Sequence, residues 1–176
     1  MAVIEAIQTT YLEAAWTASV TFDDIPSTYE HLQLRISAQD TTADVFESIY
    51  MQLGDSGHSP VDTGTNYTRH YVYAYTNNEY AGGQGSGQSD IWLGKVAATT
   101  AKFSALYGPL IVNIYDYANA NKNTSVFSLD SSGTGDYIRF TSGMWMDTSV
   151  VNAVLIKGNG NLGRSTEMTL YGLNSS

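Results

Sequence analysis

A glycine-rich segment near the C-terminal end, Gly158 to Gly163, matches the pattern G-x-G-x-x-G of dinucleotide-binding sites. In that motif the glycines let a helix N-terminus approach a pyrophosphate, and an acidic residue about 20 positions later binds the ribose. Here only 13 residues follow Gly163, and they alternate as in a strand. We therefore interpret the segment as a tight β-hairpin turn in which Asn159 and Gly160 supply positive φ angles. The sequence predicts no cofactor-binding site.

The residue types that most often carry catalysis show no catalytic spacing. The three histidines lack the spacing of a metal site, no serine lies in a G-x-S-x-G motif, and the chain has no cysteine. Carboxylates can pair without a local motif, and Asp116 is the main candidate because it follows Ile114 in the inward register of an apolar strand. We favour the other interpretation, in which Asp116 ends the strand and bonds the turn at Asn119–Asn121. We predict that the chain is not an enzyme and holds no metal.

Tyrosines form the most informative surface pattern. Tyr71, Tyr73 and Tyr75 occupy alternate positions of one expected strand, and Tyr115 and Tyr117 form a shorter stripe. Tyrosine combines apolar area with a hydroxyl group, which favours it in protein interfaces. The same rings can stack on sugars, or close the rim of the fold against its own loops. These five tyrosines are the interface candidates of the sequence, and all three interpretations remain open.

The overall charge excludes some classes of partner. The chain carries 8 Lys+Arg and 17 Asp+Glu, a net charge of −9, and only 14% of its 176 residues are charged. The basic residues are scattered singly, whereas nucleic-acid binding needs them concentrated, so we expect no nucleic-acid partner. No apolar run reaches the ~20 residues of a membrane span. The absence of cysteine and of a signal-like start favours synthesis in a cytoplasm.

Short segments of alternating polarity dominate the chain. In His31–Gln39 the apolar residues fall on one face, and segments near 106–117 and 150–157 behave similarly. The segment 45–53 is rich in β-branched and aromatic residues, which favours a strand over a short helix. Gly82–Gly87 is expected to be a flexible loop. The prediction is a single all-β domain, a jelly-roll-like antiparallel β-sandwich over residues 21–176, with residues 1–20 as an N-terminal arm or edge strand.

Three blocks of sequence occur in a characteristic order. They are TYEHLQLRISA (28–38), LIVNIYDYANANK (110–122), and SGMWMDT (142–148) followed by LYGL (170–173). This order resembles small structural proteins of tailed bacteriophages, especially phages of aquatic and cyanobacterial hosts. The likeness covers most of residues 25–173, and its motifs are structural and not catalytic.

The resemblance implies a virion structural protein. We expect a capsid decoration (cement) protein that binds the outer surface of the major capsid protein lattice and stabilises the shell. It would be made in the host cytoplasm, end on the virion surface, and associate with itself as a homotrimer. The alternative is a tail fibre or baseplate component that recognises a host surface glycan without catalysis.

Overall fold

Twelve β-strands form the regular structure of residues 3–13, 17–75, 78–99, 105–131 and 137–175, the part of the chain that the computed structural model describes. In chain order they are β1 (Val3–Tyr11), β2 (Thr17–Phe22), β3 (His31–Asp40), β4 (Phe46–Gly54), β5 (Tyr67–Tyr75), β6 (Asn78–Gln88), β7 (Ile91–Ala98), β8 (Gly108–Tyr115), β9 (Thr124–Ser131), β10 (Tyr137–Trp145), β11 (Ala153–Leu162) and β12 (Glu167–Asn174). The described residues contain no helix, which confirms the prediction of an all-β domain.

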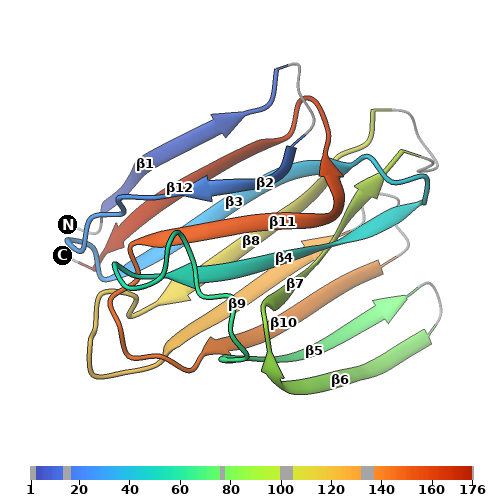
Figure 1. The fold of residues 1–176 in the computed structure, drawn as a ribbon. Helices are drawn as coiled ribbons and strands as arrows, with labels where there is room; N and C mark the ends of the chain where they lie inside the picture. The colour runs from blue at the N-terminus through green and yellow to red at the C-terminus, as the bar shows by residue number, and fades with distance from the viewer. Residues whose placement is uncertain (1–2, 14–16, 76–77, 100–104, 132–136, 176) are drawn as a thin grey trace.

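The strands are arranged in two layers (Figure 1). The large sheet has eight strands in the order β1-β12-β3-β8-β9-β10-β5-β6, and the small sheet has four in the order β2-β11-β4-β7. Neighbours within each layer are antiparallel. The layers are joined where the last residues of β3, Gln39 and Asp40, pair in parallel with Ala97 and Ala98 of β7. β1 pairs with β12, so the N-terminal segment is an edge strand of the large sheet.

The core lies between the two layers and follows the alternation of the sequence. On β3, the apolar residues Leu32, Leu34, Ile36 and Ala38 are buried, while the residues between them are half-buried or exposed. The facing side chains of the small sheet include Ile49, Met51 and Leu53 of β4, which are also fully buried. The segment 45–53 is therefore a strand, as predicted.

The segment Gly82–Gly87 is not a loop. It lies within β6, which pairs with β5 and forms the second edge of the large sheet, with two register shifts along the pair. A Cβ atom on Gly82 would lie 2.0 Å from Cδ2 of Tyr71, so a larger residue would collide with that ring. The loop prediction was wrong because the segment pairs with β5 as a strand, and at Gly82 the missing side chain makes room for the Tyr71 ring.

The segment Gly158–Gly163 is not a hairpin turn either. β11 continues to Leu162, and the chain then turns at Gly163–Thr166, where Ser165 has a φ of 65°. β11 belongs to the small sheet and β12 to the large sheet, so this turn carries the chain from one layer to the other. In the described residues 164–175 a strand and no helix follows the glycines, which excludes the dinucleotide-binding arrangement.

Candidate binding surfaces

The tyrosine stripe of β5 faces the interior of the molecule. The ring of Tyr71 meets that of Trp92 on β7 edge-on, with centroids 4.6 Å apart, and lies 6.2 Å from the ring of Tyr73. The buried guanidinium of Arg139 lies 3.9 Å from the Trp92 ring centroid and 5.5 Å from that of Tyr73. These aromatic and cation–π contacts fasten β7 to the β5–β10 part of the large sheet. Tyr71 and Tyr73 therefore pack against other residues of the same fold. Of the three interpretations of the stripe, this agrees with the one in which the rings close the rim of the fold.

The other candidate tyrosines do not form one surface. Tyr75 belongs to β5, but its side chain lies outside the described part of the structure. Tyr115 ends β8 and is 40% exposed. Tyr117 is completely buried and donates a hydrogen bond to the Pro26 carbonyl oxygen, so its assignment to an interface was wrong. The stripe is interrupted because Asp116 adopts a φ of 53°, which reverses the chain between the two tyrosines.

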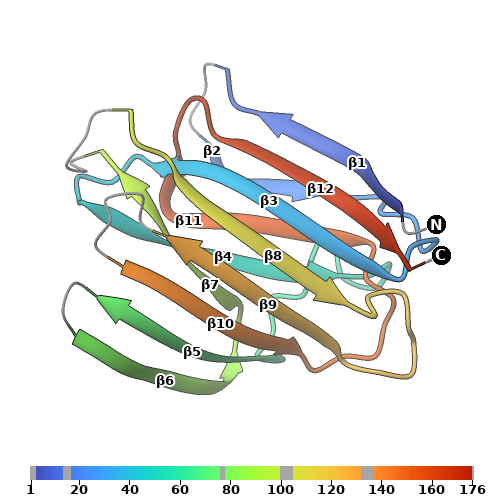
Figure 2. The same cartoon turned by 180° about the vertical axis from the view of Figure 1, so that it is seen from behind.

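An uncovered row of apolar side chains crosses the outer face of the large sheet. Ile111, Leu129, Phe140 and Val72 lie directly opposite one another on β8, β9, β10 and β5. Ile111 and Phe140 are each 44% exposed and Val72 is 51% exposed, whereas Leu129 is half-buried. Figure 2 shows the eight strands of this face with no other element in front of them. We call these four residues the apolar row.

Two neighbouring residues extend the apolar row. The Phe127 ring contacts the Phe140 ring at a centroid distance of 5.7 Å. Ile138 is 47% exposed and lies two residues before Phe140 on β10. Exposed apolar side chains that are scattered singly are ordinary, but a contiguous patch on a soluble protein indicates an interaction surface.

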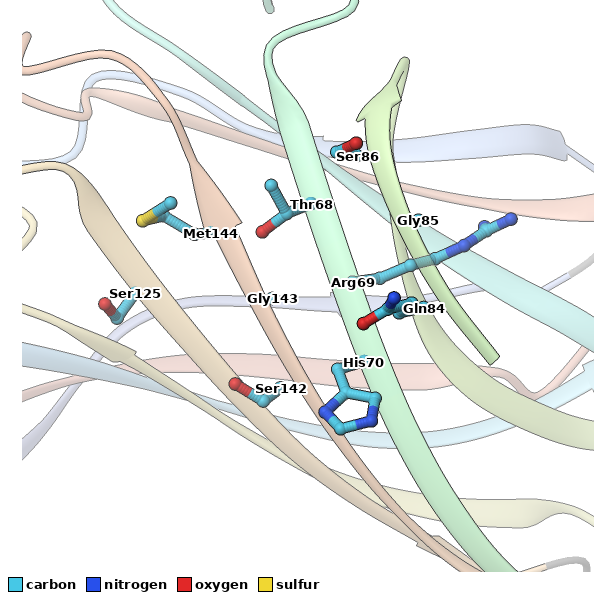
Figure 3. A pocket seen from close by; sticks show the side chains of 10 residues that line it. All are labelled: Thr68, Arg69, His70, Gln84, Gly85, Ser86, Ser125, Ser142, Gly143 and Met144. Atoms are coloured by element: carbon cyan, nitrogen blue, oxygen red, sulfur yellow. The ribbon is translucent and has the colours of Figure 1, made fainter. Parts of the chain in front are cut away.

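A shallow hollow of about 580 Å³ lies beside the apolar row on the same face (Figure 3). Met144 sits between Ser125 of β9 and Thr68 of β5, and Ser142 lies opposite His70. Figure 3 shows these hydroxyl groups and the imidazole ring along three adjacent strands. The hollow therefore offers hydroxyl and imidazole groups for hydrogen bonding next to apolar area, as an interface requires around its core.

The outer face is also poor in charge. Within the described part, no Asp, Glu, Lys or Arg occupies an outward position on β5, β8, β9 or β10. The charged residues of these strands, Arg69, Asp130 and Arg139, alternate with the exposed positions and point to the other side. Asp130 and Arg139 are buried, and Arg69 Nη1 lies 3.8 Å from Asp90 Oδ1. A chain with net charge −9 thus presents one broad neutral face, and depletion of charge is typical of interface cores.

A buried polar cluster lies at the end of β10. Asp62, 3% exposed, accepts hydrogen bonds from Trp145 Nε1 and Asn66 Nδ2, both at 2.8 Å, and from the Gly64 amide at 2.7 Å. Although burial opposes ionisation, these hydrogen bonds hold the pKa of Asp62 below its usual value. His58 Nδ1 lies 2.6 Å from Asp55 Oδ1, a hydrogen bond that raises the pKa of His58. The cluster ties the β4–β5 connection to the end of β10, and sequence patterns gave no sign of it because its partners are 83 residues apart.

The catalytic candidate Asp116 is a structural residue. Its carboxylate lies 2.7 Å from Lys122 Nζ, a contact that lowers the pKa of Asp116, and its backbone carbonyl accepts a hydrogen bond from the Asn119 amide. It therefore closes the turn after β8. Among the described residues, no three His, Cys, Asp or Glu side chains are grouped closely enough to hold a metal ion. The same part of the chain has no helix long and apolar enough to cross a membrane.

Comparisons with known proteins do not identify a family for this chain. No protein-family model matches the sequence, and no curated protein matches it. Among solved structures, the binding domain of botulinum neurotoxin serotype G aligns with 97% of this chain at 9% identity and a TM-score of 0.18. The alignment covers 43% of that chain, less than half of its length. A similarity at this score carries no argument about fold or function.

Proposed function

We propose that the chain is a virion structural protein of a tailed bacteriophage that decorates the capsid. In this proposal the outer face of the large sheet docks on the lattice of major capsid proteins and stabilises the shell. The protein would be made in the host cytoplasm and would have no catalytic role.

The observation that carries the proposal is the apolar row on a neutral face. Its exposed side chains belong to four adjacent strands in register, so the sheet itself holds them in one rigid surface. A rigid surface loses little conformational entropy on binding. Many copies on one lattice would add weak contacts into a stabilising total. The choice of a capsid as partner rests on the three sequence blocks that resemble phage structural proteins.

We further propose that copies associate as homotrimers, because a capsid lattice offers local three-fold positions. The free edge of β1 supports self-association. Within the described part of the chain β1 pairs only with β12, which leaves one row of its backbone groups without a strand partner. Sedimentation of the protein and its stoichiometry on particles test this directly, and a monomer on the particle would refute the trimer.

The copy number in purified virions tests the role. Hundreds of copies per particle are expected for decoration. A few copies to a few tens would refute it, and would favour the alternative of a tail component that recognises a host glycan.

A matched pair of variants tests the surface. Phe140→Ser should weaken binding to particles that lack the protein at least tenfold, as expected for an aromatic residue at the centre of an interface. Leu155→Ser is the control, because Leu155 is a half-buried apolar residue on β11 of the small sheet and lies on neither the apolar row nor β1. Equal binding by both variants would refute docking through the apolar row.

A further inference from the structure

A second hollow, of about 470 Å³, lies over the outer surface of the small sheet. It is therefore on the opposite side of the molecule from the apolar row. Its lining includes the side chains of Ser19, Gln52, Leu155, Lys157, Asn159 and Asn161. They come from β2, β4 and β11, three adjacent strands of one sheet.

The glycines of the G-x-G-x-x-G segment form the floor of this hollow. A Cβ atom on Gly158 would lie 2.4 Å from Asp40 Oδ2, and one on Gly160 would lie 2.6 Å from Asp40 Oδ1. The buried carboxylate of Asp40 accepts hydrogen bonds from the Gly160 amide at 3.1 Å and from the Thr42 amide at 2.8 Å. Asp40 thus holds the strand in place beneath the hollow. The residues that alternate with the glycines, Asn159 and Asn161, are exposed at its rim.

The lining is rich in amide and hydroxyl groups. Asn159 Nδ2 donates to Glu47 Oε2 at 2.7 Å, and Gln52 Nε2 donates to the Ser89 carbonyl at 2.9 Å, so both amides have fixed orientations. An amide offers a donor and an acceptor side by side, which matches adjacent hydroxyl groups of a sugar. Leu155 adds apolar area for the C–H face of a sugar ring.

The charges around the hollow favour a neutral ligand. Lys157 Nζ is already paired with Asp90 Oδ2 at 3.2 Å. The carboxylates of Glu47 and Asp40 lie at the rim and under the floor. An anionic ligand would face these negative charges, whereas a neutral one would not.

We infer that the hollow on the small sheet binds a neutral saccharide. This inference goes beyond the capsid role and does not depend on it. It also uses different residues from Tyr71 and Tyr73, which the sequence suggested as a sugar platform.

An array of immobilised oligosaccharides tests the inference. It should carry neutral hexose and N-acetylhexosamine oligosaccharides beside sialylated and sulfated ones, and we expect selective binding to neutral members. Calorimetry with the best neutral oligosaccharide should show about tenfold weaker binding for Asn161→Ala, which removes one hydrogen-bonding amide. Asn121→Ala, an exposed asparagine in the β8–β9 connection, is the matched control and should bind as the wild type does.

Three outcomes would overturn the inference. They are no binding to any neutral oligosaccharide, preferential binding to the acidic ones, and wild-type affinity of Asn161→Ala. Ser19→Ala provides a second variant on β2 if Asn161→Ala is misfolded by circular dichroism. Phe140→Ser should keep full saccharide binding, because it changes only the opposite face. Failure of capsid docking and failure of saccharide binding are thereby measured separately.

Discussion

Replacing Asp62 with alanine should destabilise the protein strongly. The change removes three hydrogen bonds to a carboxylate that is 3% exposed, and leaves the indole N–H of fully buried Trp145 without its partner. The Gly64 and Asn66 donors are on exposed or half-buried residues and can bind water instead. One buried unsatisfied donor costs about 1–3 kcal/mol, and the lost charge-assisted bonds bring the total to about 3–4 kcal/mol. For a domain of this size that corresponds to a fall in Tm of roughly 6–16 °C.

Thermal unfolding followed by circular dichroism and tryptophan fluorescence measures the effect. Asp62→Asn keeps an oxygen acceptor for Trp145 but loses the charge, so its cost should be smaller, about 1–2 kcal/mol. Asp44→Ala is the control, because this aspartate is exposed and bonds only locally to the Val45 amide. A fall in Tm below about 3 °C for Asp62→Ala, or equal losses for the alanine and asparagine variants, would refute the reasoning.

Three further predictions concern pH, the glycine floor and the tyrosine stripe. The hydrogen bond that His58 Nδ1 donates to Asp55 raises the pKa of His58. The stabilisation from His58 is therefore complete below the unfolded pKa of about 6.5 and is lost as pH rises through the folded pKa. The Tm difference between wild type and His58→Gln should therefore narrow from about pH 6 to about pH 9, and a constant difference would contradict this. Gly158→Ala should cost about 1–3 kcal/mol because its Cβ would collide with Asp40 Oδ2. Denaturant unfolding measures the free energy of unfolding of the double variant Gly158→Ala/Asp40→Ala. Its loss of stability should be smaller than the sum of the losses of the two single variants, whereas an additive loss would exclude the collision. Tyr71→Ala should lower the free energy of unfolding by about 2–3 kcal/mol through its contact with Trp92, yet leave capsid binding of the folded protein unchanged. If Tyr71→Ala lost capsid binding while its stability was unchanged, Tyr71 would instead be an interface residue.

Local alternation predicted the strands well where each had one polar and one apolar face. The inward residues of β3 and β8 were identified correctly, because a period of two specifies the buried face without knowledge of the partner strand. β6 was missed because its glycine-rich segment carries no alternating pattern, and it is recognised as a strand only by its pairing with β5. The pairing of β1 with β12 and the division into two layers depend on contacts between distant segments, which alternation does not encode.

The binding surfaces were less accessible from the sequence. The shared face of Tyr71 and Tyr73 was predicted, but Trp92 and Arg139 make it an inner face. The apolar row was missed because its members lie on four separate strands, where each is a single exposed apolar residue. Only the register of the sheet brings them together. For the same reason, the glycine-rich segment was identified without its partner Asp40, which lies 120 residues away.

The pairing of β1 with β12 affects how the chain folds during synthesis. Val3 lies opposite Asn174, so β1 cannot pair until β12 has been synthesised. At 5–20 residues per second, the ribosome needs on the order of 10–30 s to make the 171 residues from Ile4 to Asn174. During that time the edge of β3 that will pair with β12 is also unpaired. The large sheet can be completed only once β12 has been synthesised, and until then the nascent chain exposes two unpaired strand edges that chaperones or neighbouring nascent chains can bind.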